Sequence, residues 1–265
     1  MRRYYPLSGR GDYEVILDTA ICQVVYEVNM RTLRDKGIII TGAGGTIAGA
    51  VEQAFVEAGA RLLLVDRDPV RIKGRASSYN TPPLEADMSS LENAEEMIHR
   101  AKTYLGKVDG IIHLVGEIVT GSVGELPADA FDLAFHSNMR TLYYAAKAIL
   151  PELMKREEGF IAGIASQEAW GGGAANASLF AASKSAVATF LRSLDAELQS
   201  SNIAVAIVFP MGPVDTLTNR RQLPSSEPRT LISPKAIAGA LVTAALSGDG
   251  GRLLELPIYP PRAVS

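Results

Sequence analysis

Two hydrophobic patterns alternate along the chain from Met30 onward. Short apolar runs, typical of buried strands, are followed by stretches in which apolar residues recur at helical spacing. The predicted strands are residues 38–40, 61–65, 82–86, 108–115, 159–164, 203–209 and 253–258, and the predicted helices are residues 47–58, 92–104, 129–150, 178–199 and 234–246. This order, with short connections, predicts a single α/β domain over residues 30–265. Its sheet should be mainly parallel and doubly wound, with about seven strands and helices on both faces.

Two helix boundaries follow from local sequence signals. Ser89 and Glu92 have the spacing of a capping box, in which two side chains satisfy free amide groups at a helix start. Pro151 follows Leu150 and is expected to end the helix over residues 129–150, because proline lacks the amide hydrogen that a helix interior needs.

Two segments lie outside the alternation. Residues 1–29 form an N-terminal extension whose apolar part, residues 15–28, carries Asp18 and Glu27. It is too short and too charged for a membrane span or a signal peptide. It is expected to be a strand or short helix that covers an edge or a subunit interface, or else an upstream extension of a chain that begins at Met30. Residues 213–233 are rich in Pro, Arg, Ser and Thr, and their place beyond a strand end suits a mobile substrate lid.

The composition excludes several classes of partner. The 265 residues are 47% hydrophobic and 21% charged, with a net charge of −3 and no Lys/Arg run, which disfavours nucleic acid and anionic membrane surfaces. Cys22 is the only cysteine, so an intramolecular disulfide is excluded and a reducing, cytoplasmic location is expected. The three histidines lack metal-ligand spacing, and no metal is proposed.

A glycine-rich turn follows the first predicted strand. Gly42, Gly44 and Gly45 stand between the apolar run and the next helix. Glycines let a backbone turn sharply close to a ligand, and the amide groups at the helix start favour a phosphate. A dinucleotide pyrophosphate is the usual occupant of such a turn, although the same turn also serves merely to pack a helix on a sheet. No Gly-Lys-Ser/Thr follows, which disfavours a nucleoside triphosphate site.

An acidic residue ends the second predicted strand. Asp66 lies about twenty residues beyond the glycine turn, where a carboxylate can accept hydrogen bonds from the adenosine ribose. This arrangement favours NAD(H) over NADP(H), because a 2′-phosphate would meet a negative charge. Arg67, the next residue, instead favours NADP(H), since a guanidinium can pair with that phosphate. The alternative for Asp66 is an ordinary turn former.

Taken together in chain order, the motifs from Met30 to Ile258 resemble the classical short-chain dehydrogenase/reductase family with its Rossmann-type fold. The segment beginning at Thr41 resembles the family's TGxxxGxG turn, with Thr46 and Ala48 in place of the later two glycines. His113-Leu-Val-Gly116 occupies the place of NNAG and keeps only the glycine, and the segment from Pro210 to Thr216 resembles PGxVxT with one residue more. The resemblance implies a cofactor-binding set of Gly42, Gly44, Gly45, Thr46, Ile47, Asp66, Arg67, Asp87, Met88, Val115, Gly116, Lys184, Pro210, Gly212 and Thr216.

The same resemblance implies a catalytic set with one departure. Asn138 matches the asparagine that holds a relay water, Ser166 the serine that orients the carbonyl, and Lys184 the lysine of YxxxK that contacts the nicotinamide ribose. Phe180 stands where the family has its catalytic tyrosine, and a phenyl ring cannot donate or accept a proton. Each of these residues has a structural alternative, such as a strand-end serine, a solvated lysine or core packing.

Two function classes therefore remain. The first is an NAD(P)-dependent oxidoreductase that interconverts a small-molecule alcohol and carbonyl by hydride transfer. The second is a catalytically silent homologue that binds a dinucleotide or small ligand as a sensor or partner subunit. The resemblance also implies a homodimer or homotetramer. In the lid, Arg220, Arg221 and Arg229 suit either an anionic substrate or, as the favoured alternative, a solvated surface.

Overall fold

One parallel sheet organises the chain. The computed structural model describes residues 32–171, 173–222, 231–247 and 251–262. Within them, seven strands pair in the order β3-β2-β1-β4-β5-β6-β7, and every pairing is parallel. The strands are β1 (Gly37–Thr41), β2 (Arg61–Asp66), β3 (Pro83–Glu85), β4 (Gly110–His113), β5 (Glu158–Ile164), β6 (Asn202–Pro210) and β7 (Glu255–Ile258). The predicted doubly wound α/β fold is confirmed.

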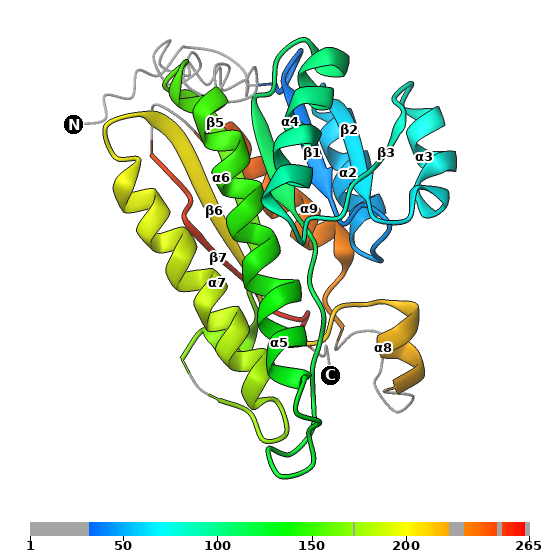
Figure 1. Cartoon of the computed structure of the whole chain (residues 1–265), viewed down its shortest axis with the longest axis vertical. Helices are drawn as coiled ribbons and strands as arrows, with labels where there is room; N and C mark the ends of the chain where they lie inside the picture. Colours follow the sequence, from blue (N-terminus) through cyan, green and yellow to red (C-terminus); the bar gives the residue numbers. More distant parts are fainter. Residues whose placement is uncertain (1–31, 172, 223–230, 248–250, 263–265) are drawn as a thin grey trace, which may run out of the picture. The chain divides into compact units, whose positions relative to one another are not determined.

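Helices cover both faces of this sheet (Figure 1). They are α2 (Ala48–Glu57), α3 (Lys73–Ser78), α4 (Leu91–Leu105), α5 (Ala130–Phe135), α6 (Thr141–Met154), α7 (Ser178–Glu197), α8 (Leu217–Gln222) and α9 (Pro234–Leu246). In β1, Ile39 joins the core formed with α4, α6 and α7, whereas Ile38 and Ile40 join the core formed with α2 and α9. Alternate side chains of a strand point to opposite faces, so one apolar run supplies both cores.

The helix predicted over residues 129–150 is wrong in two respects. It is broken into α5, a π-helical turn over His136–Arg140, and α6. Pro151 also lies inside α6, which continues to Met154. The loss of one hydrogen bond in the last turn is tolerated because Leu153, three residues from the expected end, is fully buried in the core of the sheet.

Other local differences concern elements too short for a periodic signal. The cap of α4 is Ser90, whose Oγ accepts the amide of Asn93 at 3.1 Å, so the capping box predicted from Ser89 is wrong. Helices α3 and α8 were not predicted, and α8 lies within the predicted lid. The extension over residues 1–29 and lid residues 223–230 lie outside the described residues.

Candidate active site

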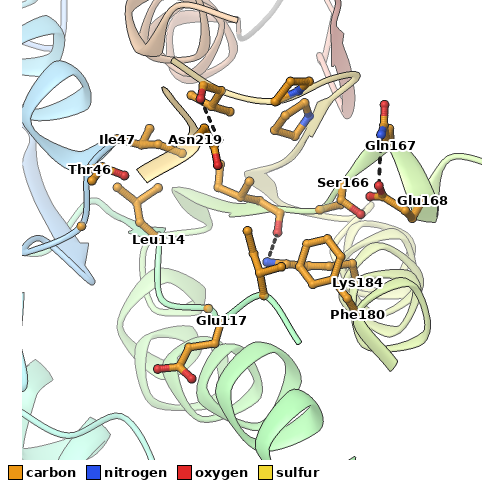
Figure 2. A pocket seen from close by; sticks show the side chains of 18 of the residues that line it. Thr46, Ile47, Leu114, Glu117, Ser166, Gln167, Glu168, Phe180, Lys184 and Asn219 are labelled. Carbon is orange, nitrogen blue, oxygen red and sulfur yellow. Dashed lines mark hydrogen bonds between the residues drawn. The ribbon is translucent and has the colours of Figure 1, made fainter. Parts of the chain in front are cut away.

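Two neighbouring cavities lie at the carboxyl ends of the central strands. The larger has a volume of about 720 Å³, and its walls come from the turn after β1 and from the segments after β4, β5 and β6 (Figure 2). The smaller has a volume of about 160 Å³ and is lined by residues that follow β1, β2, β3 and β4. The edge formed by strand carboxyl ends is where ligands bind in open α/β sheets.

The glycine turn forms one wall shared by both cavities. Gly42 has φ +68°, and a Cβ there would lie 2.7 Å from the amide nitrogen of Val115. A Cβ on Gly44 would lie 2.8 Å from Asp66 Oδ2. A larger residue at either position would therefore displace the backbone or the carboxylate. The turn leaves a cradle next to the start of α2, the environment that a dinucleotide pyrophosphate requires.

Asp66 is held in a fixed orientation at the end of β2. Its Oδ2 atom accepts the amide of Gly44 at 2.7 Å, and its Oδ1 atom accepts the amide of Asp68 at 3.0 Å. The residue is 8% exposed and lines the smaller cavity together with Arg67. A carboxylate offers about four lone-pair sites, so acceptors remain for hydroxyl donors in that cavity.

An ion pair between α2 and α3 supports the glycine turn. Arg75 on α3 donates from Nε to Glu52 Oε2 on α2 at 2.7 Å, and from Nη2 to the carbonyl of Ala43. Glu52 is fully buried, and burial raises the pKa of its carboxyl group. The pair therefore joins two helices to the glycine turn.

Asn138 lies on the π-helical turn and is 1% exposed. Its side chain accepts the amide of Glu117 at 3.1 Å and donates to the Glu117 carbonyl and to Ser183 Oγ, both at 3.0 Å. A Cβ on Gly116 would lie 2.5 Å from Asn138 Oδ1, so the glycine permits the asparagine to bind the segment after β4. The Asn138 side-chain amide therefore fixes the part of the cavity wall that contains Gly116 and Glu117.

His113, in the place of the first NNAG asparagine, joins β1 to α6 through a buried network. Its Nδ1 lies 2.8 Å from Thr41 Oγ1 and its Nε2 lies 3.1 Å from Thr141 Oγ1. Thr141 donates its own hydroxyl to the Ser137 carbonyl, so it accepts from Nε2–H and the ring is the Nε2–H tautomer. Burial, followed by the charge of Lys184, lowers the pKa of His113 to about 3. The imidazole is therefore neutral and structural.

Lys184 reaches the cavity from α7. Its Nζ donates to the carbonyl of Ile164, at the end of β5, at 2.9 Å, and the residue is 7% exposed. Burial lowers the pKa of Lys184 to about 8. A lysine held this way presents its remaining N–H groups to the larger cavity, which it lines.

Ser166 and Phe180 lie on the walls of the same cavity (Figure 2). Ser166 is 6% exposed, and its buried Oγ has no hydrogen-bond partner. Buried hydroxyl groups normally have partners, so an unpartnered one on a cavity wall points to a ligand atom. The Phe180 ring centroid lies 6.0 Å from Lys184 Nζ, and the ring supplies no hydroxyl group there.

The structure brings most of the predicted site residues to these two cavities. The larger is lined by Gly42, Gly45, Thr46, Ile47, Gly116, Ser166, Phe180, Lys184, Pro210 and Gly212. The smaller is lined by Gly42, Gly45, Asp66, Arg67, Asp87, Met88 and Val115. Three predicted residues line neither cavity. Gly44 and Asn138 support the walls, and Thr216 accepts the amide of Asn219 through its Oγ1 at 3.1 Å.

Several lining residues were not predicted from the sequence. Glu117 directly follows Gly116, Glu168 is two residues after Ser166, and Asn219 lies in α8. For Glu117 and Glu168 the available signal was their position shortly after a predicted strand. Arg220 of the lid instead pairs with Asp215.

No helix in the described part of the chain is long and apolar enough to cross a membrane.

The all-parallel sheet, with the glycine turn and both cavities at the carboxyl ends of its strands, is a Rossmann-like fold with a candidate ligand site. The family model for short chain dehydrogenase matches residues 36–226, and the chain belongs to the short-chain dehydrogenase/reductase family. Membership implies an NAD(P) cofactor. The described cradle fits one, because its glycines leave space where any Cβ would collide with the turn or the carboxylate.

Two curated relatives and one solved structure are similar to most of this chain. An uncharacterised oxidoreductase of Staphylococcus aureus (strain MRSA252) is 26% identical over 234 residues, covering 87% of this chain and all of that protein. An uncharacterised oxidoreductase of Staphylococcus epidermidis (strain RP62A) is 26% identical over 189 residues, covering 71% of this chain and 81% of that protein. The crystal structure of gox2181 has a similar fold, with a TM-score of 0.78 at 19% identity over 88% of this chain and 97% of that one.

Proposed function

We propose that this protein is an NAD(P)-dependent oxidoreductase that interconverts a small-molecule alcohol and its carbonyl compound. The observation that carries the proposal is the unpartnered, buried Ser166 Oγ on the wall of the cavity that Lys184 enters. A hydroxyl donor and an ammonium group at one cavity can bind an oxygen atom that gains negative charge during reduction. The nicotinamide, when bound, supplies the hydride chemistry.

The chain's own residues have separate roles in this proposal. The turn from Gly42 to Thr46 holds the pyrophosphate, and Lys184 holds the nicotinamide ribose. Ser166 donates its hydroxyl to the substrate oxygen. Pro210 and Gly212 shape the wall beside the nicotinamide, and Asn138 keeps the segment after β4 in place through its bonds to Glu117.

Asp66 supports NAD(H) as the cofactor rather than NADP(H). Its carboxylate is nearly buried, and two amide groups fix it at the smaller cavity. A ribose hydroxyl can donate to this carboxylate, whereas a 2′-phosphate would be repelled. The Arg67 side chain is 74% exposed and forms an ion pair with Glu117, at 3.7 Å. This carboxylate partly neutralises the charge of Arg67.

Phe180 supports the rival function of a silent dinucleotide-binding homologue. Positioned acid–base catalysis typically contributes about 10²- to 10⁴-fold, so loss of the phenol is a serious defect unless another group transfers the proton. The retained Ser166, Lys184 and Asn138 favour an enzyme.

Calorimetry with NADH and NADPH, followed by a carbonyl-reduction panel, tests the proposal. The natural protein should bind NADH more tightly than NADPH, and Asp66→Ala should reduce that preference. The natural protein and Phe180→Tyr are then compared on the panel. Turnover by the natural protein supports the enzyme, activity in Phe180→Tyr alone supports the silent homologue, and failure of both dinucleotides to bind overturns the cofactor assignment.

We also propose that the protein forms a homodimer or homotetramer through the helices that carry Asn138 and Lys184. Phe131 on α5 and Tyr143 on α6 are large apolar or aromatic side chains with 54% and 40% exposure. Tyr143 packs edge-on against the half-buried Phe190 of α7, with ring centroids 6.0 Å apart, so aromatic side chains of α6 and α7 are in contact. Light scattering tests this proposal, and a monomeric mass would contradict it.

A further inference from the structure

The cavity raises a specific chemical problem, because Phe180 has no proton to exchange. Oxidation of an alcohol releases a proton that a group near the reacting oxygen has to accept. In the part of the chain that the structure describes, the titratable side chains on the cavity wall are Glu117 from the segment after β4, Glu168 from the turn after β5, and Lys184 from α7. A proton acceptor on the cavity wall has to be sought among these three groups.

Two of the three groups are engaged elsewhere. Lys184 donates to the Ile164 carbonyl, and an ammonium group cannot accept a further proton. Glu117 also lines the smaller cavity, and its Oε1 lies 3.7 Å from the Arg67 guanidinium. Figure 2 shows its carboxylate pointing away from Ser166.

Glu168 is differently placed. It lies in a single helical turn, Gln167–Ala169, that begins directly after Ser166. Figure 2 shows Glu168, Ser166 and Phe180 grouped at one end of the cavity. The side chain is half-buried, and its Oε1 accepts the Gln167 side-chain amide at 3.0 Å. This bond to a neutral amide orients the carboxylate.

We propose that Glu168 is the general base of this site, accepting the substrate proton that a tyrosine accepts elsewhere in the family. The inference rests on the proposed oxidoreductase function. Ser166 positions the substrate hydroxyl, and Glu168, on the same turn, takes its proton.

The step balances as follows for an alcohol and NAD⁺. The O–H bond breaks and its proton passes to a Glu168 carboxylate oxygen, while the O–H electron pair forms the new C=O bond. The C–H hydrogen leaves the carbon with its electron pair for the nicotinamide of the bound NAD⁺. The substrate is oxidised, the dinucleotide is reduced, and the half-buried Glu168 carboxylic acid returns its proton to water.

Five proteins test this assignment: the natural chain, Glu168→Gln, Phe180→Tyr, the double variant of Glu168→Gln with Phe180→Tyr, and one control. Gln keeps an oxygen that can accept the Gln167 amide but cannot act as a base. Glu197→Gln is the control, since Glu197 is exposed at the far end of α7. Each protein is assayed with NAD⁺ and a panel of cyclohexanol, 2-octanol and 1-phenylethanol, chosen because Ile47, Leu114 and Ile118 give the cavity apolar walls. NAD⁺ binding is measured separately by calorimetry.

The expected result is a difference between Glu168→Gln and the double variant. Glu168→Gln should lower kcat by about 100-fold or more with little change in KM or in NAD⁺ affinity. The double variant should recover activity, because the new phenol supplies the missing acceptor.

Other results overturn the assignment in distinguishable ways. Unchanged kcat in Glu168→Gln, or a raised KM that Phe180→Tyr does not restore, would make Glu168 at most a binding residue. NAD⁺ binding without turnover by the natural chain would also overturn it and support the silent homologue. Failure of NAD⁺ to bind the natural chain would instead overturn the proposed function itself.

Discussion

The Nζ atom of Lys184 lies 2.9 Å from the carbonyl oxygen of Ile164, so a buried ammonium on α7 is anchored to the last residue of β5. Ser166 follows this strand by two residues. The lysine therefore fixes α7, which also carries Phe180, against the strand end that carries the serine.

The lysine predicts a stability change at alkaline pH. Burial lowers the pKa of Lys184 from 10.5 to about 8, so between these values the unfolded chain binds more protons at this site than the folded chain does. The free energy of unfolding should therefore rise with pH across this window, by on the order of 3 kcal/mol in total from this group. Denaturant unfolding of the natural chain and Lys184→Met at pH 8 to 10 measures the difference in slope. Exposed Lys147→Met is the control, and an equal slope in Lys184→Met would contradict the prediction.

His113 predicts a stability change on the acidic side. Its pKa is lowered from 6.5 to about 3, so its contribution to stability is present above pH 6.5 and is lost as the pH falls toward 3. Between pH 7 and pH 5 this one group should reduce the free energy of unfolding by about 2 kcal/mol. His113→Asn should flatten that slope even if it lowers stability at pH 7. His99→Asn, at an exposed position, should keep the natural slope.

Gly44 predicts a loss of cofactor affinity. In Gly44→Ala the new Cβ would lie 2.8 Å from Asp66 Oδ2, and the carboxylate cannot move freely because Asp68 also binds it. The dissociation constant for NADH should rise by about tenfold or more, which calorimetry can measure. Gly49→Ala is the matched control, because the nearest described atom to its Cβ is the Arg75 Cδ at 3.9 Å. Equal effects of the two substitutions would contradict the role assigned to the turn.

The Glu52–Arg75 pair predicts a non-additive pair of substitutions. Arg75→Met removes the partner of a fully buried carboxylate and should lower the free energy of unfolding by about 3 kcal/mol. Glu52→Leu combined with Arg75→Met removes both charges and should be less destabilising than Arg75→Met alone. Urea denaturation of the natural chain, Glu52→Leu, Arg75→Met and the double variant measures this, and simple additivity of the two single effects would be the contrary result.

The sheet could be predicted because its central strands, such as β1 and β4, are apolar runs buried on both faces. The approximate position of the site was also predictable, since the carboxyl ends of parallel strands meet at one edge. Helices α3 and α8, with six residues each, are too short for a helical period to be visible. The break before α6 escaped prediction because a π-helical turn barely disturbs the apolar spacing.

Two side chains show that the spacing of residues in the sequence does not predict long-range contacts. His113 has no neighbour in sequence that signals its contacts, because Thr41 and Thr141 come from β1 and α6. Glu168 follows Ser166 closely, yet only the cavity wall distinguishes it from a surface glutamate. Long-range contacts of this kind depend on how the strands are brought together.

Transfer of deuterium from NADH is the most direct measurement of the proposed redox function. NADH labelled with deuterium at both C4 positions is incubated with the natural protein and the carbonyl panel, and the products are examined by mass spectrometry. The predicted result is an alcohol with one deuterium on the former carbonyl carbon, formed despite Phe180. NADH binding without deuterium in any product would contradict the oxidoreductase function and favour a silent, dinucleotide-binding homologue.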